Sequence, residues 1–472
     1  MFLNSSASRF RGIALFVAAV LSLGVTVACG GSYSSKTTTP PPPAGNTRAQ
    51  VKIGDAPADR VIAFEVTVGS PITVTNSNGN LQITLSSNRL ELSHMSAKME
   101  PLTLVNVPQG TYTGATVTLQ NPEVTFLDNA GTPHTIQGAA TQTVNLTFSP
   151  AITIGASPVV LGIDVNVANS LTTDQAGNIT GFNFTSSSFT FSTKAVAAAN
   201  QQDDDGELED TTGLVTSVSG STFTMNVGQS GAQLTFTTDN TTQFSDGIAD
   251  VASALNQIVK VEGTTKSDGT LFASEVEGIE NQNGAELEGV MTTVTGNPAT
   301  TVSVLAQDGI GGGMSSSKVG ASFTADVSGA QFKVDQGSVD TSGLGGIPGT
   351  PNFPFDATTL KAGQRVEIES TNAVPAAGGN ITADKVKLQQ QALQGTVANF
   401  TAGSGGAATF DLTLAADSCL TLLSGKTSVH VFVQPGTDNS FGTIGNSSAL
   451  RVRGLLFWTG TSFNLIARRV TQ

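Results

Sequence analysis

Alternation of apolar and polar residues is the feature that most limits what this chain can fold into. It runs through residues 51–195 in segments such as IAFEVTV, LQITL, EVTFLD and VNLTF. Because successive side chains of a strand point to opposite faces, such segments form strands that are buried on one side only. Gly, Pro, Asn and Asp separate the segments, as turns require. We therefore expect residues 49–195 to form an antiparallel β-sandwich.

A repeat follows the sandwich. Gly213, Gly289 and Gly395 each stand in an alternating strand that opens a unit, and each unit closes with a second alternating strand and a hairpin. Five or six short strands in about 75 residues are typical of a small closed barrel of the oligonucleotide-binding shape. The sequence predicts an all-β protein with three tandem barrels, at residues 212–280, 286–389 and 392–472. The middle unit is longer because of glycine-rich loop insertions.

One short helix is expected within the first barrel unit. Ile248, Val251 and Leu255 lie at helical spacing in the segment SDGIADVASALNQ, between two predicted strands. A helix here would place these three apolar side chains on one face. We expect that face to close one end of the barrel.

The first 28 residues have the pattern of an export signal. Arg9 and Arg11 precede an apolar stretch from Ile13 to Val27 that is short for a membrane span. The stretch ends Thr-Val-Ala-Cys-Gly and resembles the lipobox of bacterial lipoproteins, which implies cleavage before Cys29 and a lipid on its thiol. Residues 29–48 then form a Pro/Ser/Thr-rich tether. The alternative is ordinary signal cleavage after Ala28, because this sequence also satisfies the small-residue pattern.

The net charge of the chain indicates which classes of partner to expect. The chain has 36 acidic and 22 basic residues, a formal net charge of −14, which becomes −16 when Arg9 and Arg11 leave with the signal. Such a surface repels phosphate backbones, so we expect no nucleic-acid partner. The expected contact is with a membrane, through the N-terminal lipid, which would place the protein in the cell envelope, at an outer membrane or cell surface.

An acidic run separates the sandwich from the repeats. Residues 196–211 contain Asp203, Asp205 and Glu207 around a glycine, which invites a calcium interpretation. The positions that an EF-hand loop needs are not filled at either end. Like charges at this density repel one another, so we expect a solvated linker with at most weak calcium candidates.

Two parts of the chain resemble known families. The segment IGDAPADRVIAFEVTV, with the later VPQGTY, resembles the domain of unknown function family numbered 4382. The three units resemble the family numbered 5666, through Gly213, Phe244, the strand VKVEG and the segment DGTLFASEV. Both resemblances imply exported β domains and no particular activity.

Few residues qualify for chemistry. Asp55 and Asp59 in DAPAD and the single tryptophan, Trp458, are the candidate ligand contacts. The histidines, His94, His134 and His430, have no metal-ligand spacing, and His94 is expected at the surface. The second cysteine, Cys419, has no partner once Cys29 is acylated, and apolar neighbours indicate a buried, inert thiol.

These observations favour a non-catalytic envelope scaffold or interaction module. No phosphate loop or nucleophile elbow occurs, so we expect neither an enzyme nor a cofactor nor a metal. Two alternatives stay open. One is a protein that binds a small ligand, a glycan or calcium; the other is a hydrolase with dispersed carboxylates. A protein or glycan partner is not specified by the sequence.

Overall fold

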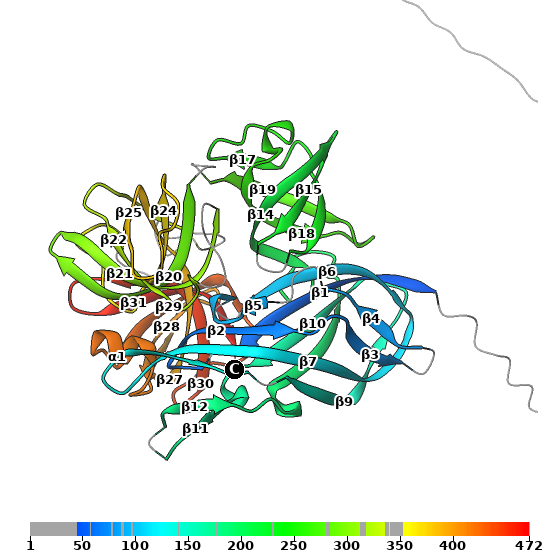
Figure 1. Ribbon diagram of the computed structural model, residues 1–472, viewed down its shortest axis with the longest axis horizontal. Coiled ribbons are helices and arrows are strands. Elements are labelled where there is room, and N and C mark those ends of the chain that lie inside the picture. Colours follow the sequence, from blue (N-terminus) through cyan, green and yellow to red (C-terminus); the bar gives the residue numbers. More distant parts are fainter. Residues whose placement is uncertain are drawn as a thin grey trace, which may run out of the picture. The chain divides into compact units, whose positions relative to one another are not determined.

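The computed structural model describes residues 45–471, except 57, 77–78, 86–88, 96–97, 140, 176, 229–230, 280–283, 312–317, 336–338 and 340–352. The predicted signal peptide, Cys29 and residues 30–44 of the predicted tether lie outside the described residues. The predicted boundary of the tether at residue 48 is too late, because β1 already begins at Asn46. Residues 44–472 form one compact unit. Strands dominate it, so the predicted all-β class is confirmed (Figure 1). Among the described residues, none lies in a helix with the length and hydropathy of a membrane span.

Residues 46–195 fold into two main sheets that share one apolar core. The first has the order β13-β10-β1-β6, and β1 pairs with β10 in parallel. The second has the order β4-β3-β7-β2-β5, with β8 and β9 also paired to β7. Buried side chains from both sheets, such as Val51 and Phe64, belong to the same core. The sandwich therefore contains one parallel pair among its otherwise antiparallel strands.

The bounds of these elements follow chain order. They are β1 (Asn46–Ala56), β2 (Val61–Val68), β3 (Ile72–Asn76), β4 (Leu81–Ile83), β5 (Arg89–Glu91), the 3-10 helix η1 (Ser93–Met95), β6 (Met99–Pro108), β7 (Gly110–Leu127), β8 (Pro133–Gln137), β9 (Gln142–Ile154), β10 (Val159–Asn166), η2 (Ala168–Ser170), the hairpin strands β11 (Leu171–Thr173) and β12 (Ile179–Phe182), η3 (Ser186–Ser188) and β13 (Phe189–Ala195).

The next sheet has six strands in the order β16-β15-β14-β18-β19-β17, and β16 also pairs with β19. Its elements are β14 (Glu207–Ser219), β15 (Thr222–Val227), β16 (Gln233–Thr237), β17 (Gln243–Ser245), η4 (Ala252–Ala254), β18 (Ile258–Thr265) and β19 (Leu271–Gly278). The predicted helix is wrong in extent, because only one 3-10 turn forms. Ile248 and Val251 enter the core, but Leu255 is 38% exposed, since the 3-10 helix ends before it and the chain turns there.

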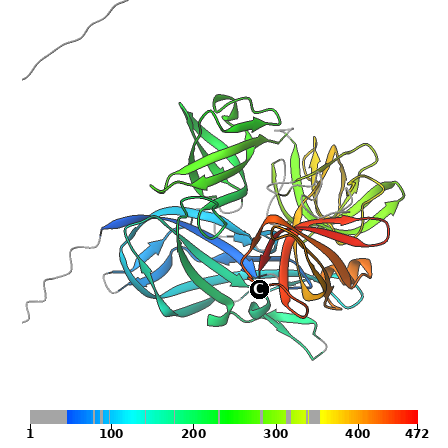
Figure 2. The same cartoon turned by 180° about the vertical axis from the view of Figure 1, so that it is seen from behind.

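Two further β units complete the chain (Figure 2). The first is a seven-stranded sheet, order β23-β26-β24-β20-β21-β22-β25, and the second is a closed barrel, order β27-β28-β29-β31-β30. Their strands are β20 (Ala285–Gly296), β21 (Ala299–Gly311), β22 (Ser322–Asp326), β23 (Gln331–Val334), β24 (Arg365–Ser370), β25 (Asn380–Thr382), β26 (Lys385–Leu388), β27 (Gln390–Ala402), β28 (Ala408–Leu414), β29 (Ser428–Asn439), β30 (Ala449–Trp458) and β31 (Phe463–Thr471), with the short helix α1 (Cys419–Ser424) between β28 and β29.

Three glycines occupy the same position in these three units. Gly213, Gly289 and Gly395 each lie on a strand that pairs with both the next strand and a later one. A Cβ atom at these positions would lie 2.3, 2.1 and 2.4 Å, respectively, from a carbonyl oxygen of the neighbouring strand. No real Cβ contact is this short, so the close approach of the strands requires glycine.

Candidate functional site

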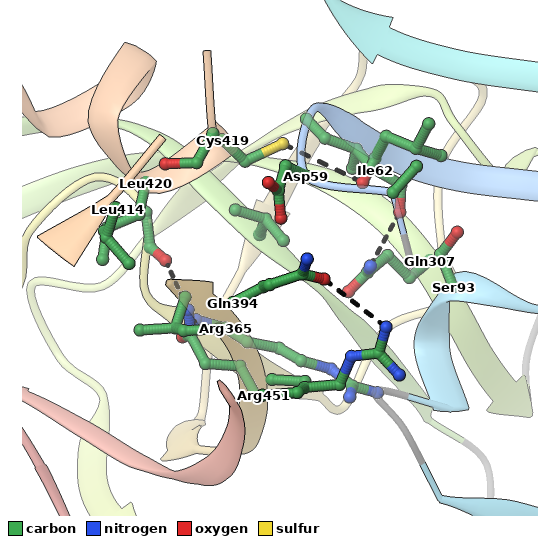
Figure 3. A pocket seen from close by; sticks show the side chains of 18 residues that line it. Asp59, Ile62, Ser93, Gln307, Arg365, Gln394, Leu414, Cys419, Leu420 and Arg451 are labelled. Carbon is green, nitrogen blue, oxygen red and sulfur yellow. Dashed lines mark hydrogen bonds between the residues drawn. The ribbon is translucent and has the colours of Figure 1, made fainter. Parts of the chain in front are cut away.

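A cavity of about 90 Å³ with both polar and apolar walls lies beside Asp59, in the turn between β1 and β2 (Figure 3). Its walls come from β2, β21, β27, β30 and the start of α1. Every second side chain of a strand points to the same face, so several strands can contribute side chains to this one cavity. Sequence reasoning singled out Asp59, but the walls from β21, β27, β30 and α1 lie more than 200 residues further along the chain.

Hydrogen bonds fix the rim of this cavity. The backbone N–H of Cys419 donates to the carbonyl oxygen of Asp59 at 2.7 Å, and Gln307 Nε2 donates to the Ile62 carbonyl at 2.7 Å. Two buried lining atoms, Ser93 Oγ and Gln307 Oε1, have no hydrogen-bond partner among the described residues. Polar atoms of this kind are normally satisfied by ordered water or a small polar molecule.

The titratable groups of the cavity favour binding over catalysis. Burial and the nearby Asp417 raise the pKa of Asp59, while Arg451 acts against them. Burial, with Asp59, raises the pKa of the Cys419 thiol to about 12. A thiol in this state is a poor nucleophile at neutral pH. The volume is also well below the 300–1,000 Å³ typical of small-molecule pockets. The cavity therefore suits water or a very small polar ligand.

Asp55 and Trp458 lie elsewhere. Asp55 is the penultimate residue of β1, is 3% exposed and does not line the cavity. Trp458 is half-buried against Phe463, with a ring-centroid distance of 4.9 Å. The ammonium groups of Lys361 and Lys426 lie 5.3 and 5.5 Å from its ring centroid. These contacts occupy ring surface on which a sugar would stack.

The acidic run is not a solvated linker, contrary to expectation. Asp203 is 2% exposed, and its carboxylate lies 3.7 Å from Lys52 Nζ and 3.6 Å from Arg469 Nη1. Glu207 is within 3.0 Å of Arg468, and Asp205 accepts a hydrogen bond from the N–H of Gln202. Cations more than 100 residues distant neutralise the run, which local sequence cannot reveal. Because the three calcium candidates already have these separate partners, the structure gives them no common ligand geometry.

The surface position predicted for His94 is also wrong. Its ring is 2% exposed, with Nδ1 2.9 Å from Glu91 Oε2 and Nε2 2.8 Å from Glu100 Oε1. The two carboxylates hydrogen-bond both ring nitrogens, which offsets the free-energy cost of burying the ring. His134 is exposed on β8 beside Asp128, and His430 lies on β29 beside Asp411.

Sequence reasoning missed a group of three glutamates. Glu286 and Glu288 lie on β20 and Glu367 lies on β24, and one carboxylate oxygen of each is within 4.8 Å of the others. The signal was present as Glu at alternate positions in AELEG and VEIES, which places these side chains on one face of the sheet. Recognising it required the register of the two strands.

Comparison with known proteins identifies one segment. Residues 212–277 match the family model described as "Domain of unknown function (DUF5666)". This covers the first of the three predicted repeats. None of the curated proteins matches the chain.

Among solved structures, the wild-type single-stranded DNA binding protein from Thermus aquaticus is 12% identical, covers 40% of this chain and 92% of its own, and has a TM-score of 0.14. A deletion mutant of that protein is 13% identical, covers 40% and 93%, and has the same TM-score. The structure titled "drosophila Unr CSD456" is 10% identical, covers 57% and 98%, and has a TM-score of 0.13.

These matches overturn the prediction that a nucleic-acid partner is excluded. A protein named for binding single-stranded DNA is among the structures similar to this chain. The prediction rested on net charge, which is an average over the whole chain and says nothing of local basic surfaces. At such low TM-scores the likeness assigns no ligand to this protein.

Proposed function

We propose that this protein is an exported, lipid-anchored envelope protein that acts as a non-catalytic scaffold or interaction module. In this proposal residues 1–28 are a signal peptide and Cys29 carries the lipid. The compact unit beyond the tether then presents a fixed arrangement of β units away from the membrane. An anchor with two or more acyl chains holds a protein at a bilayer where one chain does not.

Buried ion pairs between distant strands are the observation that carries this proposal. Arg453 on β30 lies 2.7 Å from Glu209 on β14, with both side chains at most 5% exposed. Lys260 on β18 lies 3.1 Å from Glu367 on β24. Because breaking a buried pair leaves an uncompensated charge, such pairs hold their partners in one geometry. A fixed geometry of this kind suits a spacer or scaffold better than a set of domains that move independently would.

We further propose that residues 286–389 and 392–472 are additional copies of the family unit matched at residues 212–277. The equivalent pairing of Gly213, Gly289 and Gly395 supports this interpretation. Small domains of one family share such positions because the close strand approach depends on them.

Metabolic labelling tests the anchor. Cells that express the full chain are grown with an alkyne fatty acid, and the labelled protein is detected after coupling to a fluorophore. We expect label on the wild type and on Cys419→Ser, which keeps Cys29, and none on Cys29→Ser. Label that persists on Cys29→Ser, or a wild type without label, would refute lipidation at this residue.

Binding of a small polar ligand in the cavity beside Asp59 is the second candidate function. The unpaired atoms Ser93 Oγ and Gln307 Oε1 favour it. A thermal-shift screen of small polar metabolites should then give a rise in melting temperature that Gln307→Leu abolishes. A screen in which wild type and Gln307→Leu respond alike would place any binding elsewhere.

A further inference from the structure

The cluster of Glu286, Glu288 and Glu367 is built by strand register. Glu286 and Glu288 are two residues apart on β20, so both side chains face the same side of the sheet. Glu288 pairs directly with Glu367 on the antiparallel strand β24. The register therefore brings three carboxylates from two adjacent strands to one place, where one oxygen of each lies within 4.8 Å of the others.

Glu286 is the unusual member. It is 3% exposed, and its Oε2 has no hydrogen-bond partner in the part of the chain that the structure describes. By contrast, Arg365 Nη2 donates to Glu288 Oε2 at 2.5 Å, and Gln389 Nε2 donates to Glu367 Oε2 at 2.6 Å. A buried carboxylate oxygen without a partner costs free energy unless something else satisfies it.

Cations of the protein pair with two of the three glutamates. Arg365 pairs with Glu288, and Lys260 and Lys387 lie 3.1 and 3.2 Å from Glu367. Among the described residues no ion pair includes Glu286, which leaves it as the member of the cluster that pairs with no cation.

We propose that Glu286, Glu288 and Glu367 bind one divalent cation of the hard, oxygen-preferring class, with calcium as the best fit. Calcium bonds to carboxylate oxygen at about 2.3–2.6 Å, so oxygens on opposite sides of the ion are separated by about 5 Å, which matches the cluster. A group of exclusively carboxylate donors disfavours zinc and copper. Glu286 also borders a cavity of about 270 Å³ shared with Glu369, Thr371 and Asp384, which provides a route of entry and space for water ligands.

Equilibrium dialysis of the purified full-length chain, with calcium measured by mass spectrometry, tests the site. We expect one calcium per wild-type chain and a rise in melting temperature of several degrees in CaCl₂ relative to EDTA. Glu286→Gln keeps the size of the side chain and its hydrogen-bonding capacity, so it should fold normally, and it should lose both effects because an amide is a weaker ligand for the cation than a carboxylate. Glu123→Gln, on β7 in the sandwich, is the matched control and should behave as the wild type does.

Asp205→Asn separates this site from the acidic run. The variant keeps an oxygen that accepts the hydrogen bond from Gln202, so its fold should be unchanged. Calcium binding retained in Asp205→Asn and lost in Glu286→Gln supports the proposal. Binding retained in Glu286→Gln, lost in Asp205→Asn, or absent from the wild type would overturn it.

Discussion

The environment of His94 shows how a single residue joins local and distant parts of the sandwich. Glu91, three residues before it, accepts from its ring and from the backbone N–H groups of Phe64, Ser93 and His94. Glu100 meets the other ring nitrogen from the beginning of β6. Despite burial, Glu100 and Asp308 raise the pKa of His94 well above its ordinary value. Burial opposes the effect of His94 on Glu100, but the pKa of Glu100 still falls to about 2.

These shifts predict the pH window in which the pair stabilises the fold. A raised histidine pKa contributes fully below the unfolded value of about 6.5 and is lost as pH rises toward the folded value. A lowered glutamate pKa contributes above about 4.5 and is lost as pH falls toward 2. Both contributions are complete only between about pH 4.5 and 6.5.

We predict that His94→Gln lowers the free energy of unfolding by about 3–5 kcal/mol at pH 5.5. The difference from wild type should shrink by up to about 1.4 kcal/mol per pH unit above 6.5, as the unfolded histidine loses its proton first. Urea unfolding at pH 5.5, 7 and 8.5 measures this. His134→Gln, at an exposed position, should change stability by less than about 0.5 kcal/mol. A difference that stays constant or grows with pH would contradict the assignment.

The surroundings of single residues were predicted less well from the sequence than the strands or the fold class. The apolar alternation around Phe64 and Val66 was correctly interpreted because it depends on neighbouring residues only. The cations that pair with Asp203 come from distant strands, so its burial could not be predicted from flanking residues. The partners of His94 lie three and six residues away, but a nearby glutamate does not by itself show that the ring is buried. Asp59 was identified as a candidate, but the cavity beside it depends on residues that only the tertiary fold brings near.

At the scale of elements, strand pairing explains why Gly213, Gly289 and Gly395 are glycines. Residue 395 lies in the central strand β27, between β28 and β30. Its Cβ position is 2.4 Å from the carbonyl oxygen of Thr413 and 2.9 Å from a side-chain carbon of Leu412. An added methyl group therefore requires the two backbones to separate, which disturbs the ladder on both sides of the barrel.

We predict that Gly395→Ala destabilises the protein by about 1–3 kcal/mol, the range typical of overpacking. Gly445→Ala, in the same barrel, is the control, since nothing lies within 4 Å of its Cβ position. It should leave stability unchanged or slightly improved, because alanine restricts the unfolded chain. Chemical denaturation followed by circular dichroism compares the two, and equal effects would show that close strand approach is not the constraint.

Elements were predicted well where periodicity was strong. The opening and closing strands of the units, including β14, β18, β24 and β30, appear where alternation placed them. The expected helix at residues 245–257 failed because three apolar residues at helical spacing also fit a turn that buries only Ile248 and Val251. The acidic residues from Glu207 onward begin β14 and do not lie in a linker.

At the scale of the whole molecule, buried charges connect parts of the chain that composition alone treats as separate. Glu209 on β14 forms ion pairs with two arginines of the C-terminal barrel. Arg453 on β30 lies 2.7 Å from one of its oxygens, and Arg468 Nε on β31 lies 3.5 Å from the other. Replacing one partner leaves the remaining charge buried without a counter-charge, which destabilises the fold. Replacing both partners with apolar groups removes this desolvation cost.

A double-mutant cycle tests this connection. We predict that Arg453→Met costs about 3–5 kcal/mol of unfolding free energy, and that Arg453→Met with Glu209→Leu costs at least about 1 kcal/mol less than the sum of the single changes. Lys333→Met is the control. It breaks an ion pair with Asp246 at 3.6 Å, and because the lysine side chain is 42% exposed, the change should cost less than about 1 kcal/mol of unfolding free energy.

Calorimetry tests the same connection by a second route. The wild type should unfold in one transition, and Arg453→Met should unfold in two, because the β14 sheet and the C-terminal barrel lose their shared charge pair. Strictly additive single changes, or a wild type that already unfolds in separate steps, would show that the β units fold independently and that the buried pairs do not hold them together.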